Sequence, residues 1–258
     1  MSVQSFLGYL ILGIVTLASC KKATDNPTQI NKVHIKPENR LCALTDKVYV
    51  PNYSFTRYEE TVKTYERNEK LTVDKLQHQI LFYGSSTMYF WNPYLIENFA
   101  PLPVIGHGFG GATYPEMLYF APRLLFPYKP SIIVIYCEND QFNEPEKSIK
   151  QVKDDVCELF SRIHTNLPEA KIVCLAMKHS PGRDFKWKEM EEANVLIKQM
   201  CESTNFITYK DFNSTLQDAQ GKIDSSLFES DYIHMNAKGY KKWAIALKPF
   251  LETMYASL

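Results

Sequence analysis

The chain has 258 residues, in which 29 Lys and Arg balance 29 Asp and Glu, and hydrophobic residues make up 45% of the total. This length suits one large domain or two small ones. The balanced charge and the plentiful aromatic and aliphatic residues exclude intrinsic disorder as the main state. The lack of a basic excess argues against a nucleic-acid partner, since phosphate backbones are bound mainly by clustered Lys and Arg.

The chain begins with an apolar segment at residues 6–19 (FLGYLILGIVTLAS), followed by Cys20 and two lysines. This segment is too short to cross a hydrocarbon core, which needs about 20 residues, and small residues before a cleavage point are typical of a signal peptide. The sequence LASC resembles the lipobox of bacterial lipoproteins. That resemblance implies that residues 1–20 are a lipoprotein signal peptide and that Cys20 carries a lipid anchor. A plain signal peptide and a buried helix are the alternatives.

Residues 21–50 are predicted to be a polar tether between the anchor and a folded domain at 51–258, because their first half is polar and shows no amphipathic period. The lipobox resemblance places the protein in the bacterial cell envelope. In some bacteria, an Asp after the lipidated cysteine retains a lipoprotein in the inner membrane. Lys21 stands at that position here, so the outer membrane is favoured. The membrane is then a partner only through the lipid, since no other segment has the apolar length of about 20 residues that a span requires.

The rest of the chain alternates between buried strands and amphipathic helices. Continuous apolar runs are typical of strands that are covered on both faces. They predict strands at residues 79–83, 102–105, 131–137, 171–177 and 206–209. Apolar residues at helical spacing predict helices at residues 148–164, 187–201 and 236–251. This alternation is typical of a parallel sheet sandwiched by helices, so the predicted fold class is α/β.

The cysteines after Cys20 favour neither a zinc site nor a compact disulfide framework. They lie at positions 42, 137, 157, 174 and 201, and no C-x-x-C motif occurs. No metal site is therefore predicted. Cys137 and Cys174 lie in apolar runs and are expected to be buried small hydrophobes. An exported protein can form disulfides, but the spacing leaves their pairing open.

Polar residues follow the predicted strands, at the edge where parallel sheets bind their ligands. Ser85 and Ser86 follow the first strand, Asn139 follows the third, and Asp231 and His234 precede the last helix. Acyl transfer requires a hydroxyl nucleophile, an imidazole base oriented by a carboxylate, and donors for an oxyanion. Each feature alone has an ordinary explanation, since serines also cap helices. Their co-occurrence predicts an acyl hydrolase.

Four blocks carry a family resemblance: ILFYGSSTMYFW, IGHGFGGATYPEM, KPSIIVIYCEND and LFESDYIHMNAKGYKKWA. They resemble the SGNH hydrolases, also called GDSL-type esterases, and most of all the branch similar to platelet-activating-factor acetylhydrolases and bacterial carbohydrate esterases. The resemblance extends from about residue 58 to residue 251. It implies a three-layer α/β/α, flavodoxin-like fold with a five-stranded parallel sheet.

The resemblance assigns a role to each matching position. Ser86 matches the family nucleophile, His234 matches the general base, and Asp231 matches the partner of that base. The oxyanion hole would consist of the backbone N–H groups of Ser86 and Gly108 and the side-chain amide of Asn139. The resemblance implies no metal and no organic cofactor.

Some positions depart from the family pattern or invite a role in substrate binding. His107 stands where this branch often has Arg. Cys137 stands where it usually has Gly, so that its side chain is expected to narrow the acyl pocket. His107 and His179 follow strands and are candidates for lining the pocket, with simple solvation as the alternative. Trp91, Tyr94 and Tyr119 have two open interpretations. They could form an aromatic wall that binds a sugar, or they could pack in the core.

The expected function is a serine esterase that forms an acyl-enzyme with acylated small molecules or polysaccharides. Short acetyl esters of carbohydrates are favoured because the loops after the strands are short and polar. The alternatives are a lysophospholipase or lipase-type acylhydrolase and a degenerate module that binds glycans without cleaving them. A dinucleotide site is a further alternative, because Gly106, Gly108 and Gly111 match G-x-G-x-x-G. It is disfavoured because the preceding strand is not the first of the chain and because Pro115 falls where the phosphate-binding helix would begin.

Overall fold

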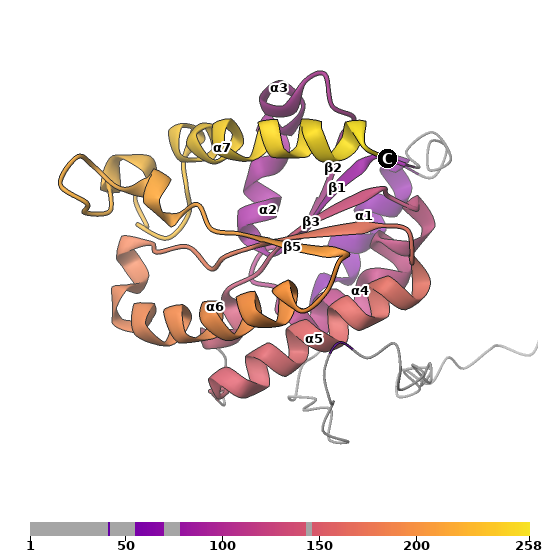
Figure 1. Cartoon of the computed structure of the whole chain (residues 1–258), viewed down its shortest axis with the longest axis horizontal. Coiled ribbons are helices and arrows are strands. Elements are labelled where there is room, and N and C mark those ends of the chain that lie inside the picture. Colours follow the sequence, from indigo (N-terminus) through magenta and orange to yellow (C-terminus); the bar gives the residue numbers. More distant parts are fainter. Residues whose placement is uncertain (1–40, 42–54, 70–77, 143–145) are drawn as a thin grey trace, which may run out of the picture. The chain divides into compact units, whose positions relative to one another are not determined.

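The computed structural model describes residues 41, 55–69, 78–142 and 146–258. A five-stranded parallel sheet lies at its centre, in the order β2-β1-β3-β4-β5 (Figure 1). The strands are β1 (Ile80–Gly84), β2 (Val104–Gly108), β3 (Ile132–Tyr136), β4 (Lys171–Leu175) and β5 (Ile207–Lys210). The predicted sheet is therefore confirmed. The predicted leader at 1–20, and the predicted tether at 21–50 apart from residue 41, lie outside the described residues.

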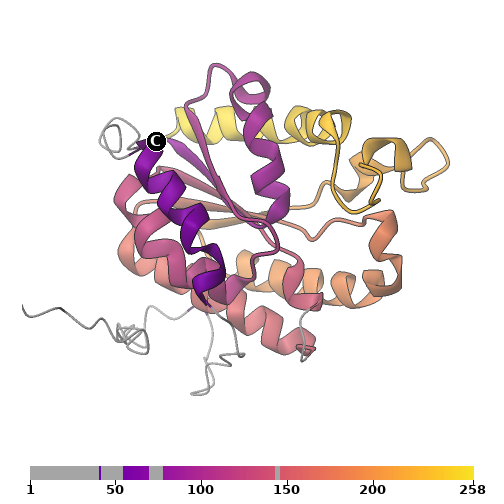
Figure 2. The same cartoon turned by 180° about the vertical axis from the view of Figure 1, so that it is seen from behind.

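Helices cover both faces of the sheet, as Figures 1 and 2 show from opposite sides. One face carries α1 (Glu59–Glu69), α4 (Tyr114–Leu124), α5 (Ile149–Asn166) and α6 (Trp187–Glu202). The other face carries α2 (Ser86–Trp91), α3 (Leu95–Phe99) and α7 (Ala237–Ala256). This three-layer α/β/α arrangement confirms the predicted fold class. Among the described helices, none has the length and hydropathy of a membrane span.

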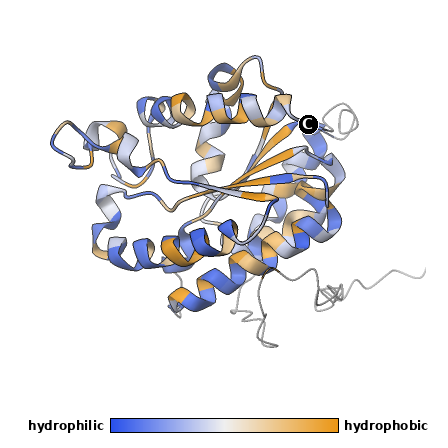
Figure 3. Ribbon diagram, viewed as in Figure 1, coloured by the Kyte–Doolittle hydropathy of each residue, from blue (hydrophilic) through white to orange (hydrophobic). Residues whose placement is uncertain are grey.

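The two helical layers explain why the strands read as continuous apolar runs. Ile80 and Phe82 pack in the cluster formed with α2, α3 and α7, whereas Leu81 and Tyr83 pack in the cluster on the opposite face. Side chains alternate between the faces of a strand, so a strand covered on both faces needs apolar residues at every position. Figure 3 shows mostly hydrophobic strands between helices in which hydrophilic and hydrophobic residues are mixed.

Strand β2 runs further than predicted, because two glycines that were expected to end it lie within it. A Cβ at Gly106 would lie 1.8 Å from Asn92 Oδ1, and a Cβ at Gly108 would lie 2.0 Å from the backbone nitrogen of Tyr89. The glycines therefore allow α2 and the turn after it to pack directly on the strand. This finding argues against the dinucleotide alternative, which needs both glycines in a phosphate-binding loop.

Helix α4 begins at Tyr114 behind a capping box formed by Thr113 and Glu116. The Thr113 N–H donates to Glu116 Oε2 at 2.9 Å. Pro115 lies in the first turn of this helix, where the missing N–H of proline costs nothing. The argument from Pro115 against a helix at this position was therefore wrong. The position of Gly106 and Gly108 within β2 is what excludes a phosphate loop.

The contact between β2 and α2 makes a stability prediction. Gly108→Ala should lower the free energy of unfolding by about 1–3 kcal/mol, because the new methyl group overlaps the α2 backbone. Gly110→Ala is the matched control. A Cβ at Gly110 would meet no atom within 4 Å, so the change should be below about 0.5 kcal/mol. Urea unfolding followed by circular dichroism measures both values, and equal losses would contradict the packing argument.

Candidate active site

Ser86 is the first residue of α2, directly beyond the end of β1. Gly84 approaches β3 so closely that a Cβ there would lie 2.0 Å from the carbonyl oxygen of Tyr136. Ser85 donates its backbone N–H to the same oxygen at 3.1 Å. The Ser85 side chain is fully buried, and its hydroxyl has no hydrogen-bond partner among the described residues. The turn therefore directs Ser86, and not Ser85, toward the other predicted site residues.

Ser86, His234 and Asp231 form a continuous hydrogen-bonded chain. Ser86 Oγ lies 3.0 Å from His234 Nε2, and His234 Nδ1 lies 2.5 Å from Asp231 Oδ2. An ionised carboxylate only accepts hydrogen bonds, so the imidazole directs an N–H from Nδ1 toward Asp231. In the neutral imidazole, Nε2 is then the acceptor for the hydroxyl of Ser86. The structure thus brings these three predicted residues together.

The turn from Asp231 to His234 is fixed by its own backbone. Asp231 Oδ1 accepts the N–H groups of Ile233 and His234 at 2.9 and 3.0 Å. Burial would raise the pKa of Asp231, but these hydrogen bonds and the one from the imidazole lower it to about 2. The carboxylate is therefore ionised at neutral pH. Tyr232 has a left-handed backbone (φ 56°), which the N–H of Gly182 supports by donating to the Tyr232 carbonyl oxygen at 2.8 Å.

Asn139 reaches the same end of the sheet from the short 3-10 helix Asn139–Phe142 after β3. Its amide nitrogen donates to the carbonyl oxygen of Ala112 at 2.8 Å. Gly108, the other predicted oxyanion residue, lies at the end of β2 against the α2 backbone. Gly111 adjoins Ala112 and has φ +78°, a conformation that favours glycine. The part of this glycine-rich segment that contacts Asn139 is the carbonyl oxygen of Ala112, and sequence reasoning missed this contact.

Comparison with known proteins agrees with this geometry. Residues 81–242 match the family model of the GDSL-like lipase/acylhydrolase family. The chain belongs to this family. Its members are carboxylic ester hydrolases, so the predicted resemblance to SGNH hydrolases is confirmed. No curated protein shows significant sequence similarity to this acylhydrolase.

Solved structures share the fold of the acylhydrolase at low sequence identity. A GDSL-like lipase from Bacteroides thetaiotaomicron has a TM-score of 0.64 and 18% identity, covering 78% of this chain and 100% of its own. An acetyl xylan esterase from Geobacillus stearothermophilus has a TM-score of 0.53 and 17% identity, covering 68% and 93%. A family 3 carbohydrate esterase from Clostridium thermocellum has a TM-score of 0.53 and 14% identity, covering 70% and 98%. At these identities the likeness establishes the fold.

Behind Asn139, the acylhydrolase holds a buried group of charges that sequence reasoning missed. Glu138 Oε1 lies 2.7 Å from Lys178 Nζ and 2.8 Å from Arg183 Nη1, and Tyr136 donates its hydroxyl to the other carboxylate oxygen. Burial would raise the pKa of Glu138, but the two cations outweigh it and hold the pKa below its usual range. The sequence feature that could have indicated this cluster is the position of Glu138 and Lys178, because each follows a buried strand.

The structure overturns the proposed pocket role of His107 and gives His179 packing partners. His107 is buried, with Nδ1 2.6 Å from the carbonyl oxygen of Leu124 and Nε2 2.9 Å from Glu69 Oε2. It points into the layer of α1 and α4 because β2 places alternate side chains on opposite faces. His179 stacks on Trp187 at 5.1 Å between ring centres. His107 therefore lies in the helical layer and not beside the nucleophile, and His179 has Trp187 and Glu191, whose Oε1 is 3.4 Å from His179 Nε2, as partners.

Cys137 and the predicted aromatic wall also take structural roles. The Cys137 thiol is buried and donates to the carbonyl oxygen of Ala112 at 3.1 Å. It therefore packs beneath the glycine-rich turn, and these contacts do not support a narrowed acyl pocket. Trp91 is fully buried in the core, and Tyr119 stacks on Phe55 at 4.6 Å. Tyr94 packs against the core beside Tyr240, so core packing explains all three aromatic residues.

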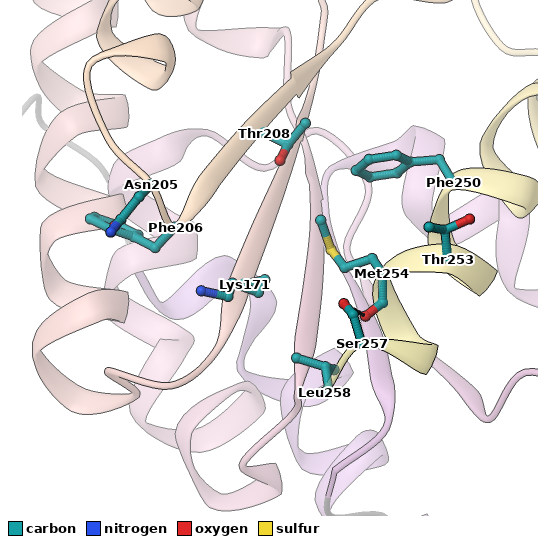
Figure 4. A pocket seen from close by; sticks show the side chains of 9 residues that line it. All are labelled: Lys171, Asn205, Phe206, Thr208, Phe250, Thr253, Met254, Ser257 and Leu258. Atoms are coloured by element: carbon teal, nitrogen blue, oxygen red, sulfur yellow. Dashed lines mark hydrogen bonds between the residues drawn. The ribbon is translucent and has the colours of Figure 1, made fainter.

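A cavity of about 300 Å³ lies away from the catalytic residues (Figure 4). Its lining includes Lys171, Phe206 and Thr208, at the beginning of β4 and β5, together with residues from the end of α7. Ser86 and Asn139 follow the carboxyl ends of their strands. The cavity is therefore at the opposite edge of the sheet from the catalytic residues. Within the described part of the chain, no cluster of His, Cys, Asp and Glu has the makings of a metal site.

The charge cluster behind Asn139 makes a prediction about stability. Glu138→Gln should lower the free energy of unfolding at pH 7 by about 3–5 kcal/mol, because it leaves the buried Lys178 without its anion. The pKa of Glu138 is lowered in the folded state, so this stabilisation is complete above the unfolded pKa of about 4.3 and declines as the pH falls below it.

The control for this prediction is Glu97→Gln, which changes an exposed carboxylate on α3. Its effect should stay below about 0.5 kcal/mol. Urea unfolding of both variants and the wild type from acidic to neutral pH measures the difference. A Glu138→Gln protein as stable as the Glu97→Gln protein would contradict the assignment of an ionised, paired Glu138.

Proposed function

We propose that this acylhydrolase is a serine esterase that removes short acyl groups, above all acetyl, from carbohydrates through an acyl-enzyme. The observation that carries the catalytic part is the chain of contacts from Ser86 through His234 to Asp231, at 3.0 and 2.5 Å. A hydroxyl is a weak nucleophile that needs a base, and the base needs an orienting group. These three residues satisfy both requirements.

In the first half of the reaction, Ser86 Oγ attacks the ester carbonyl carbon while His234 Nε2 accepts its proton. Asp231, which is ionised at neutral pH, stabilises the imidazolium that forms. The backbone N–H groups of Ser86 and Gly108 and the amide of Asn139 are assigned to the oxyanion. The imidazolium then protonates the leaving alcohol, and the acyl group remains on Ser86.

In the second half, water attacks the acyl-enzyme and His234 accepts a proton from it. Collapse of the second tetrahedral intermediate releases the carboxylic acid and returns the proton to Ser86. Every group that moves a proton is thus supplied by this chain. Ser86, His234 and Asp231, which lie within hydrogen-bond distance of one another, are sufficient for the proton transfers of both steps.

The choice of a short acyl group on a carbohydrate rests on the character of the strand ends and on structural neighbours. The side chains beside the catalytic residues include Asn139, Glu138 and Arg183, which are polar or charged. An acetyl xylan esterase and a carbohydrate esterase share the fold. A long acyl chain would need an apolar wall along its length, since each buried CH₂ contributes about 0.8 kcal/mol.

The first test separates Ser86 from its neighbour. Ser86→Ala should lower kcat for 4-nitrophenyl acetate by several orders of magnitude, as loss of a nucleophile does. Ser85→Ala should keep most of the activity, because the buried Ser85 hydroxyl has no partner to lose among the described residues. Steady-state hydrolysis and labelling with a fluorophosphonate probe measure both variants. An inactive Ser85→Ala beside an active Ser86→Ala would refute the assignment, and a folded but unlabelled wild type would favour a binding module.

The second test concerns the acyl group. The kcat/KM for monomeric 4-nitrophenyl esters should be highest at acetate or propionate and should fall with longer chains, because the apolar side chains near the nucleophile are open to solvent and do not enclose a long acyl chain. The series from acetate to palmitate measures this trend below the critical micelle concentrations. A maximum at octanoate or a longer ester would favour a lipase or lysophospholipase.

We further propose that Cys20 is lipidated and anchors the enzyme in the bacterial envelope, with the outer membrane favoured. The LASC motif and the apolar leader support this assignment. Cys157 is disulfide-bonded, which is typical of proteins exported from the reducing cytosol. Cys137, Cys174 and Cys201 are free and buried.

The anchor is tested by replacing its cysteine. Cys20→Ser should move the protein from the membrane fraction to the soluble fraction of a bacterial expression host, because the thiol that would carry the lipid is gone. Radiolabelled palmitate should label the wild type and not the variant. Membrane partition that does not change with this substitution would instead indicate an uncleaved apolar anchor.

A further inference from the structure

The most exposed aromatic side chains of the described residues lie on segments that carry or contact the catalytic residues. Tyr89, Phe90, Phe185 and Tyr232 have 44–68% of their surface exposed. These four residues are called the aromatic rim below. The other large hydrophobic side chains with comparable exposure are aliphatic: Ile96, Val195, Leu196, Ile245 and Leu258. Exposed apolar surface that is concentrated in one region is typical of a binding site.

Three of the rim residues lie on the same segments as catalytic residues. Tyr89 and Phe90 lie three and four residues after Ser86 in α2, and so one helical turn from it on the same side. The Phe90 ring lies 4.9 Å from the imidazole of His234. Tyr232 lies inside the turn that holds Asp231 and His234, and its left-handed backbone accompanies an exposed side chain.

Phe185 joins the rim from the other side. It belongs to the 3-10 segment η7 (Pro181–Lys186), whose Gly182 donates its N–H to the carbonyl oxygen of Tyr232 at 2.8 Å. A Cβ at Gly182 would lie 2.9 Å from the Asp231 carbonyl oxygen, so η7 packs tightly on the catalytic turn. The Phe185 ring lies 6.1 Å from the ring of Phe142, in the 3-10 helix that begins at Asn139. Three separate segments that carry or contact the catalytic residues therefore present exposed rings.

We infer that the aromatic rim is a subsite for the sugar rings of an acylated oligosaccharide, so that chain residues beyond the acylated sugar bind outside the catalytic centre. This inference rests on the proposed function and adds the residues that select a glycan. A pyranose ring has an apolar C–H face and a polar edge. Such a ring can cover an exposed aromatic face while its hydroxyl groups remain in water.

The openness of the rim favours a sugar over a fatty chain. An acyl tail gains free energy when it is enclosed on all sides, whereas each rim side chain has about half or more of its surface in solvent. Flat, half-exposed rings suit a flat ligand that stays partly hydrated. A lipid bilayer is the other surface that attracts exposed aromatic residues, and the experiment below separates the two.

The experiment compares two substrates in the same enzyme. The substrates are 4-nitrophenyl acetate and chemically acetylated hexamers of xylose, mannose and N-acetylglucosamine. Phe185→Ala should lower the ratio of kcat/KM for the preferred hexamer to that for 4-nitrophenyl acetate by about 5-fold, and the double variant with Tyr232→Ala by about 25-fold. The loss should appear mainly as a rise in KM for the hexamer. Ile96→Ala and Ile245→Ala, which change exposed aliphatic side chains, should leave the ratio unchanged.

Each outcome decides between the claims. Failure of the wild type to hydrolyse 4-nitrophenyl acetate overturns the proposed esterase. Hydrolysis of 4-nitrophenyl acetate with no hydrolysis of any hexamer overturns the glycan subsite alone, as does a ratio that the rim variants do not change. Phosphatidylglycerol and phosphatidylethanolamine vesicles are the third probe. Loss of vesicle binding in the rim variants with an unchanged substrate ratio would assign the rim to a membrane surface and overturn the subsite.

A different observation concerns the orientation of the Asn139 amide. Arg183 Nη2 donates to Asn139 Oδ1 at 3.2 Å, while Asn139 Nδ2 donates to the Ala112 carbonyl oxygen at 2.8 Å. A guanidinium only donates and a carbonyl only accepts, so both contacts require the same amide orientation. The reversed amide would place its NH₂ against the cation and its oxygen against another oxygen.

Arg183 is itself held in place from two sides. Its Nη1 lies 2.8 Å from Glu138 Oε1, and its guanidinium lies over the ring of Phe142 at 4.0 Å from the ring centre. Glu138 remains paired with Lys178 whether or not Arg183 is present. Neutralising the buried carboxylate accounts for one contact of Arg183, and its hydrogen bond to Asn139 needs another explanation.

We propose that Arg183 is a positioning residue that fixes the Asn139 amide with its NH₂ group toward the oxyanion. This also rests on the proposed function, because it acts through the oxyanion hole. A fixed donor requires no reorganisation when charge develops on the substrate oxygen, which is the source of its catalytic effect. An amide free to rotate would present the wrong atom part of the time.

The test is a double-mutant cycle on 4-nitrophenyl acetate. Arg183→Met should lower kcat about 10-fold with KM changed less than about 3-fold, and Asn139→Ala should lower kcat by about 100–1000-fold. Adding Arg183→Met to Asn139→Ala should cause no further loss, because the residue that Arg183 positions is gone. Arg162→Met, which removes a partly buried pair with Glu158 on α5, is the control and should leave kcat unchanged.

The cycle separates positioning from other roles. Equal losses from Arg183→Met with and without Asn139 would show that Arg183 acts independently and would overturn the proposal. A rise in KM with constant kcat would make it a substrate contact and would also overturn it. Thermal unfolding of each variant reports whether it is folded, and Arg183→Lys, which keeps a donor, should recover part of the lost kcat if Arg183 acts by donation. An inactive wild type would instead refute the proposed esterase.

Discussion

The catalytic end of this protein depends on one close approach of two backbones, where Gly84 of β1 meets the carbonyl group of Tyr136 in β3. The parallel register sets Gly84 level with Gly108 on one side and with Tyr136 on the other. Only a residue without Cβ fits at this point, because the atom would lie 2.0 Å from the carbonyl oxygen. The N–H of Ser85 then satisfies that oxygen, and the chain leaves the sheet with Ser86 as the first helical residue. His234 comes 148 residues later, and the two side chains meet because both segments are tied to this edge of the sheet.

Buried charge performs a second task at this edge, on both sides of Asn139. Glu138 is paired with cations of the segment after β4, and Asp140 is paired with Lys147, whose Nζ lies 2.5 Å from it. Asp140 also accepts the N–H of Tyr114, the first residue of α4, at 2.9 Å. Buried ion pairs contribute little to net stability because desolvation of the charges is costly. Their value here is geometric, since they fasten the segment containing Asn139 to α4 in one direction and to the segment after β4 in the other.

The sequence predicted the alternating strands and helices of the fold and the site residues that follow the strands. All five strands were recognisable because both faces of the sheet are covered and the runs are continuously apolar. The position of His107 was not predictable, because it depends on α1, where Val62 is the one buried residue and the helical pattern is weak. The exposed rim was also missed. A single sequence does not show which aromatic residues of α2 face the core and which face solvent, and Trp91 and Phe90 are adjacent with opposite environments. The charges behind Asn139 were interpreted as loop residues because Glu138 and its partner Lys178 are 40 residues apart.

Helix α2 joins these features in only six residues. A helix this short has no stability of its own, because nucleation costs more than so few hydrogen bonds return. It is held by contacts at both ends: its first turn lies against the backbone of Gly108, and Trp91 at its last position is buried in the core. The hydroxyl of Tyr240 adds a hydrogen bond to the Thr87 carbonyl oxygen at 3.0 Å. Because Ser86 opens this helix and Phe90 follows one turn later, the packing that sets the direction of the nucleophile also sets the position of the ring beside His234. Catalytic geometry and the surface around it are therefore determined by the same contacts with the sheet, and a change in those contacts would alter both together.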